Sequence, residues 1–268
     1  MNELLILIPI LLVSGVVAGL LAGLLGVGGG IVIVPMLYHI FLYMNIDISI
    51  AMPLSIGTSL STIVITSIIS AKSHHKKGGI DWDLSKKWIP FVIIGVLIGA
   101  FSSKFIDGTN LKFMFGILLL VVSINMIISS FKNLVIAKSL PGMFGQSIFA
   151  TLLGGFASLL GIGGGTLMVP LLSLYSFPIH KAVSTASLFG LIISVPATIG
   201  YIIVGWDVQN LPFGSTGYVN WLAFAVLVPM TMFFAPYGVK LAYSLNVKQL
   251  KVAFAVFLAC VGIKMVLV

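Results

Sequence analysis

The feature that most constrains this chain is a run of apolar stretches with almost no charge inside them. Of the 268 residues, 59% are hydrophobic and only 7% are charged, whereas ordinary soluble domains carry about a quarter charged residues. One soluble core cannot bury that much apolar surface, so the surrounding solvent must be lipid. The sequence therefore predicts an all-α, polytopic membrane protein.

Ten apolar stretches can be marked, and most have the ~20 residues that a helix needs to cross ~30 Å of hydrocarbon. They cover residues 4–25, 31–44, 50–71, 88–106, 110–131, 143–160, 166–177, 181–204, 218–243 and 248–268. The second and the seventh are too short, at roughly 21 Å and roughly 18 Å as helices. Both follow three glycines directly, so we expect half-helices or re-entrant segments there.

The lysines orient these segments in the membrane. All 14 basic residues are lysines, and five of them lie in the loop 72–87, which the positive-inside rule places in the cytoplasm. Alternation of the spans then puts 11 of the 14 lysines inside and leaves Lys104, Lys112 and Lys264 outside. The net charge of +8 thus reflects topology, and no nucleic-acid partner is expected.

The chain also repeats itself. LLGVGGGIVIVPML at 24–37 returns as LLGIGGGTLMVPLL at 159–172, with nine of 14 positions identical after a shift of 135. Each half, 1–134 and 135–268, then holds five segments in the same order within one integral membrane domain. Because five is odd, the second half should insert upside down. Inverted repeats with interrupted helices are typical of secondary transporters, which bind substrate between the repeats near the bilayer midplane.

Small residues upstream of each motif are spaced for close helix packing. Gly15, Gly19 and Gly23 recur at intervals of four, and Ala150, Gly154 and Ser158 mirror them in the second half. Such faces let two helices approach closely in lipid. We therefore expect each of these segments to press on another helix.

The three glycines fit backbone recognition of an anion better than other glycine-rich motifs. No GK[ST] follows them and no acidic or histidine cluster accompanies them, so neither a nucleotide, a metal nor another cofactor is expected. HExxH and GxSxG patterns and a mid-membrane acid pair are also absent from the sequence, which argues against an enzyme. A helix beginning after each GGG directs free N–H groups and the positive end of its dipole inward, which suits an anion. The alternative is that the glycines only permit tight helix crossing.

Polar side chains inside the apolar segments give further candidates. His39 lies in the first short segment, where it is either a proton-coupling group or a hydrogen-bonded helix-end residue. Hydroxyl groups line the third and eighth segments, and they either bind substrate oxygens or bond back to their own helix. Those nearest the glycines are Thr58, Ser59, Thr185 and Ser187. His74 and His75 lie in the lysine-rich loop and are expected to be solvated.

The paired LLGxGGG…VP motifs, each followed by a TSL-type stretch, resemble the sulfite exporter TauE/SafE family across essentially the whole chain. The resemblance implies transport of small organosulfur anions, such as sulfite or sulfonates, across the bacterial inner membrane. The implicated positions are Gly28, Gly29, Gly30, Pro35, Thr58, Ser59, Gly163, Gly164, Gly165 and Pro170. The second copy departs from the first, because TASL places Ala186 opposite Thr58 and leaves the hydroxyls of Thr185 and Ser187 beside it.

The expected function is secondary transport of a small anion by alternating access around a midplane site. The alternative is an anion channel with the same glycine-lined filter. The expected partners are the small anionic substrate, the lipid bilayer and a proton as the candidate coupling ion.

Overall fold

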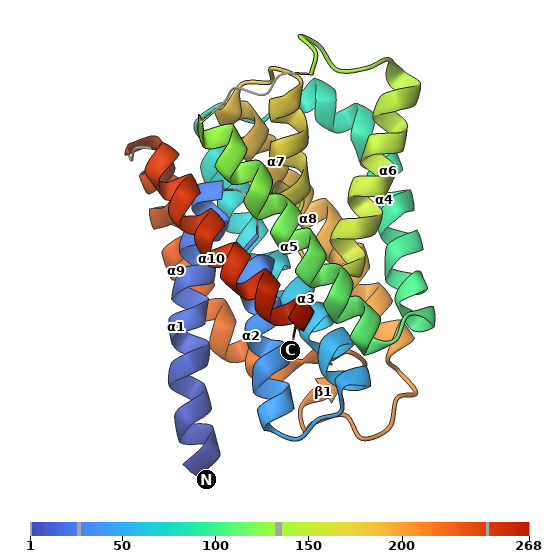
Figure 1. The fold of residues 1–268 in the computed structure, drawn as a ribbon. Coiled ribbons are helices and arrows are strands. Elements are labelled where there is room, and N and C mark those ends of the chain that lie inside the picture. The colour runs from blue at the N-terminus through green and yellow to red at the C-terminus, as the bar shows by residue number, and fades with distance from the viewer. Residues whose placement is uncertain (1, 26–27, 132–135, 245–246, 268) are drawn as a thin grey trace.

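A computed structural model describes residues 2–25, 28–131, 136–244 and 247–267 of the chain (Figure 1). The helices are α1 Asn2–Leu25, α2 Gly30–Tyr43, α3 Ile48–His75, α4 Trp82–Ser102, η1 Ser103–Phe105, α5 Gly108–Phe131, α6 Met143–Leu159, α7 Gly165–Leu174, α8 Ile179–Val204, α9 Trp221–Ser244 and α10 Val247–Leu267. The strands β1 Ser215–Thr216 and β2 Val219–Asn220 form an antiparallel hairpin before α9. The predicted all-α class is confirmed. The expected boundary between the halves, at 134/135, lies outside the described residues.

Five helical stretches are long and apolar enough to cross a membrane within the part of the chain that the structure describes. They are Ile48–His75, Trp82–Phe105, Gly108–Ser130, Ile179–Val204 and Trp221–Leu241. The two helices that follow the glycines are much shorter, with 14 residues in α2 and 10 residues in α7. The prediction of two short helices after the GGG motifs is therefore confirmed.

Side-chain caps fix where three of the long helices begin. Asp47 accepts a hydrogen bond from the Ser49 N–H before α3, and Asp81 accepts one from the Leu84 N–H before α4. Asn220 caps α9 in the same way, through its side-chain oxygen and the Ala223 N–H at 2.9 Å. Such caps satisfy N–H groups that have no acceptor within the helix. The turn before α3 and the hairpin both lie at the lower end of Figure 1 (hereafter the hairpin end).

The helices pack in pairs. Helix α1 lies against α9, α6 against α4, α3 against α8, and α5 against α10 (Figure 1). When α1–α5 are matched in order with α6–α10, the α1–α9 pair maps onto the α6–α4 pair. The α3–α8 and α5–α10 pairs map onto themselves. The packing therefore follows the order of the sequence repeat.

The predicted small-residue faces form two of these contacts. A Cβ at Gly19 would lie 2.9 Å from the Thr231 Cα of α9, and a Cβ at Gly154 would lie 3.1 Å from the Val92 Cα of α4. Real side chains do not approach a backbone so closely, so these helices touch through their main chains. The expected close packing of α1 and α6 is confirmed.

Candidate functional site at the crossing of the glycine motifs

The two glycine motifs meet inside the molecule. A Cβ at Gly28 would lie 3.3 Å from the Gly163 Cα, and a Cβ at Gly30 would lie 3.0 Å from the Ile162 Cα and collide with the Gly161 carbonyl. Main chains of the two sequence repeats therefore touch without side chains between them. We call this contact, formed by residues 28–30 and 161–165, the glycine crossing.

Left-handed backbone explains part of the glycine requirement. Gly28 and Gly29 have φ angles of 72° and 83°, and Gly161 has a φ of 69°. Residues with a Cβ rarely adopt this region, whereas glycine does so readily. Gly164 has a right-handed φ of −53°, so the two motifs enter their short helices with different backbone shapes.

Both short helices begin at the glycine crossing and are buried there. The N–H of Val32 bonds to the Gly29 carbonyl at 3.0 Å, and the N–H of Thr166 bonds to the Gly163 carbonyl at 3.3 Å. Helix geometry gives the first N–H groups of each helix no acceptor four residues back. The positive ends of two helix dipoles therefore point at one buried region.

The two prolines lie inside the short helices, where each leaves one carbonyl group without its helical hydrogen bond. Pro35 in α2 and Pro170 in α7 have no N–H, so they cannot bond to the carbonyls of Ile31 and Thr166 four residues back. These carbonyls are acceptors and have no attraction for an anion. The proposed contact of the prolines with substrate stays a prediction.

Two of the predicted hydroxyls bond to backbone close to the glycine crossing. Ser59 Oγ donates to the Gly161 carbonyl at 2.9 Å, which ties α3 to the second motif. Thr58 Oγ1 accepts from the Asn220 N–H at 2.9 Å, which ties α3 to the hairpin. Both side chains are fully buried.

Thr185 makes the bond in the second half that Thr58 makes in the first. Its Oγ1 accepts from the Asp81 N–H at 3.0 Å. Asp81 caps α4, and Asn220 caps α9, the helix that corresponds to α4 in the repeat order. The hydrogen bonds thus match Thr58 with Thr185. The sequence motif aligns Thr58 with Ala186 instead, and that alignment stays a prediction.

Most other hydroxyls of α3 and α8 bond back to their own helix, as the alternative reading anticipated. Thr62 donates to the Thr58 carbonyl and Thr66 to the Thr62 carbonyl, each four residues back. Ser187 donates to the Ser184 carbonyl at 2.6 Å. These bonds occupy the hydroxyl protons, and the predicted role of Ser187 in substrate binding stays a prediction.

Thr166 is a residue that the sequence analysis did not single out. It directly follows Gly165, is 3% exposed, and its hydroxyl has no hydrogen-bond partner among the described residues. The equivalent residue in the first motif is Ile31. In the sequence, Thr166 is marked only by this difference between the two motifs.

The candidate histidines lie away from the glycine crossing. His39 is half-buried, nine residues after Gly30 or about 14 Å along α2, so it does not join the glycine crossing. His74 is 1% exposed, with its Nε2 3.3 Å from the Gly23 carbonyl and its Nδ1 3.1 Å from Ser184 Oγ. The expectation that His74 is solvated is wrong, because α3 continues four residues beyond the predicted end; His75 is exposed as expected.

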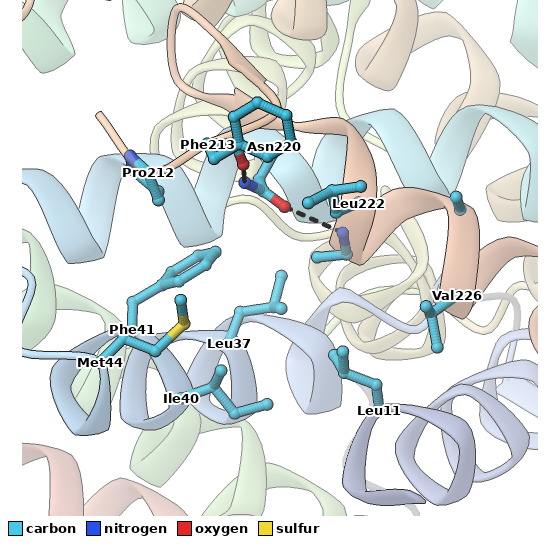
Figure 2. Close-up of a pocket in the computed structure, with 12 residues that line it drawn as sticks. Leu11, Leu37, Ile40, Phe41, Met44, Pro212, Phe213, Asn220, Leu222 and Val226 are labelled. Atoms are coloured by element: carbon cyan, nitrogen blue, oxygen red, sulfur yellow. Dashed lines mark hydrogen bonds between the residues drawn. The ribbon is translucent and has the colours of Figure 1, made fainter. Parts of the chain in front are cut away.

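A cavity of about 580 Å³ lies between α1, α2 and α9 at the hairpin end (Figure 2). Leu37 and Phe41 of α2, with Met44 directly after this helix, form one wall. At the opposite rim the Asn220 amide donates to the Phe213 carbonyl at 3.2 Å and accepts from the Ala223 N–H. The residue that bonds to Thr58 therefore also borders this cavity.

The fold and the crossing of its interrupted helices define a multi-pass membrane protein. The chain belongs to the sulfite exporter TauE/SafE family, whose model matches residues 11–265.

Curated relatives carry transporter names. A probable membrane transporter protein of Haemophilus influenzae is 34% identical over 90% of this chain and 91% of its own length. A probable membrane transporter protein of Methanocaldococcus jannaschii is 30% identical over 99% of this chain and 97% of its own length. The probable membrane transporter protein YunE of Bacillus subtilis is 28% identical over 96% of both chains. No solved structure matches.

Proposed function

We propose that this protein is a secondary transporter that moves sulfite or a related organosulfur anion across the cell inner membrane by alternating access. The main support for the proposal is the glycine crossing, where two buried helix N-termini converge. Irregular backbone at membrane depth is stable only when protein buries it or it lines a cavity. Converging N–H groups and dipoles suit a small oxyanion.

Thr166 supplies the side-chain donor for this anion. Its buried hydroxyl lies in the first turn of α7 and lacks a partner among the described residues. An unpartnered buried hydroxyl is unfavourable unless a ligand satisfies it. The sulfite or sulfonate oxygens are such acceptors, and membership of the sulfite exporter family supports this substrate class.

Alternating access is supported by the paired bonds of Thr58 and Thr185. The Thr58–Asn220 bond joins α3 to the hairpin, and the Thr185–Asp81 bond joins α8 to the residue that caps α4, next to the loop 72–87. In the proposed cycle the two halves are inverted repeats, 1–134 and 135–268, and one of these bonds opens at a time. The loop 72–87 faces the cytoplasm, and the hairpin faces outside. His39 is retained as the candidate proton-coupling group.

Uptake of radiolabelled sulfite by Thr166→Val in proteoliposomes tests the proposal. A hydrogen bond to an anion contributes about 1.5–3 kcal/mol, so its loss should weaken sulfite affinity about tenfold or more. Valine has nearly the same shape and removes an unpartnered hydroxyl, so the unfolding temperature should stay or rise.

The control is Gly155→Ala, where a Cβ would make an ordinary contact of 3.4 Å with the Gly95 carbonyl. Wild-type affinity in Thr166→Val would contradict the proposed site. Sulfite currents proportional to voltage, without gradient-driven accumulation, would assign the crossing to a channel.

A further inference from the structure

A groove between α1, α2 and α10 carries basic side chains that lie away from the glycine crossing. Its volume is about 310 Å³, which falls in the range of about 300–1,000 Å³ typical of small-molecule sites. Its lining comprises Val13, Ser14, Val17, Val32, Pro35, Met36, His39, Phe257, Val261 and Lys264. The α2 residues are spaced three and four apart, so one face of the short helix forms the wall.

Two basic groups, His39 and Lys264, line this groove. No carboxylate is among the lining residues that the structure describes.

The predicted membrane topology places Lys264 on the outer side. The positive-inside rule leaves only Lys104, Lys112 and Lys264 on the outer side. One of these three, Lys264, lines the groove together with His39. A lysine on the side that the rule disfavours, in a groove whose described lining includes no carboxylate, indicates an attraction for an external anion.

The remainder of the groove is apolar. Val13 and Val17 of α1 and Phe257 of α10 are exposed large side chains along it. We propose that the groove binds an organic anion on the outer side, with its charged head at His39 and Lys264 and its apolar part along these three residues. The ligand comes either from solution, as an organic sulfonate, or from the outer leaflet, as an anionic phospholipid.

The charged end of the groove is distinct from the glycine crossing, since His39 lies about 14 Å along α2 from Gly30, whereas Val32 and Pro35 line the end of the groove that is nearer to the crossing. Its existence therefore does not depend on the transport proposal. The Thr166→Val variant reports on the crossing and leaves the groove intact. Failure of either proposal can thus be recognised separately.

Calorimetric titration of benzenesulfonate into the protein in neutral detergent tests the free-anion source. Loss of a charge-assisted hydrogen bond in Lys264→Gln should weaken binding by about tenfold or more, and Lys264→Arg should retain it. Lys104→Gln is the matched control, because Lys104 is an exposed lysine on the same side that does not line the groove.

Native mass spectrometry after incubation with phosphatidylglycerol tests the lipid source. Retention of this lipid by the wild type and Lys104→Gln, and its loss from Lys264→Gln and His39→Gln, would support the groove as a lipid site. Selective loss of benzenesulfonate binding would support it as a soluble-anion site. If Lys264→Gln binds both probes as the wild type does, or if the wild type binds neither, the proposal is overturned.

Discussion

The bond between Thr58 and the hairpin gives a prediction whose size follows from burial. In Thr58→Val the shape of the side chain is kept, but the Asn220 N–H loses its acceptor at 2.9 Å. Asn220 is 5% exposed and Thr58 is fully buried, so water does not replace the lost hydroxyl. A buried donor left without a partner costs about 1–3 kcal/mol. We expect the free energy of unfolding to fall by about this amount.

The second half provides the comparison. Thr185→Val removes the corresponding acceptor of the Asp81 N–H, but Asp81 is only partly buried and water can reach it. Its effect should therefore be smaller than that of Thr58→Val. Thr62→Val is the control within α3, since it removes only a bond to a carbonyl of its own helix.

Equilibrium unfolding in mixed micelles, followed by tryptophan fluorescence, measures these differences, and amide exchange at Asn220 reports the bond directly. Faster exchange in Thr58→Val is expected. The reasoning is refuted if Thr58→Val is as stable as Thr62→Val and its Asn220 amide exchanges at the wild-type rate.

Three further changes test other parts of the fold. Gly29→Ala should lower the unfolding temperature far more than Gly155→Ala, because a left-handed alanine costs about 1–2 kcal/mol before any contact is counted; equal temperatures would contradict this. Hydrogen bonds from Ser49 hold the pKa of Asp47 below its usual value, so the carboxylate stabilises the fold above the unfolded pKa and loses this effect as pH falls through the folded pKa. The advantage of the wild type over Asp47→Asn in thermal unfolding should disappear in acid, and an advantage that persists there would refute the assignment. His74→Leu should lose stability by about 1–3 kcal/mol in chemical unfolding, since the buried bonds of the imidazole are removed; no loss would show that these bonds are dispensable.

The helices could be predicted because their signals are local. Apolar length marked the spans, and the glycines marked where α2 and α7 begin. The spacing of Gly15, Gly19 and Gly23 predicted a close helix contact, although it did not identify α9 as the partner. Each of these signals lies within one segment of the chain.

The arrangement of the site could not be predicted, because it depends on contacts between distant segments. The bond from Ser59 to Gly161 spans 102 positions, and the bond from Thr58 to Asn220 spans 162. His74 was misplaced because its neighbours in sequence are lysines, whereas its contacts in space are Gly23 and Ser184.

The central claim is that an oxyanion binds where the two glycine motifs meet. Crystals grown with selenite, an analogue of sulfite that scatters anomalously at the selenium edge, test it most directly. We expect an anomalous peak at the glycine crossing, within hydrogen-bond distance of Thr166 Oγ1 and the first amides of α2 or α7. A peak confined to the groove at Lys264, or anywhere else away from residues 28–30 and 161–166, would contradict it.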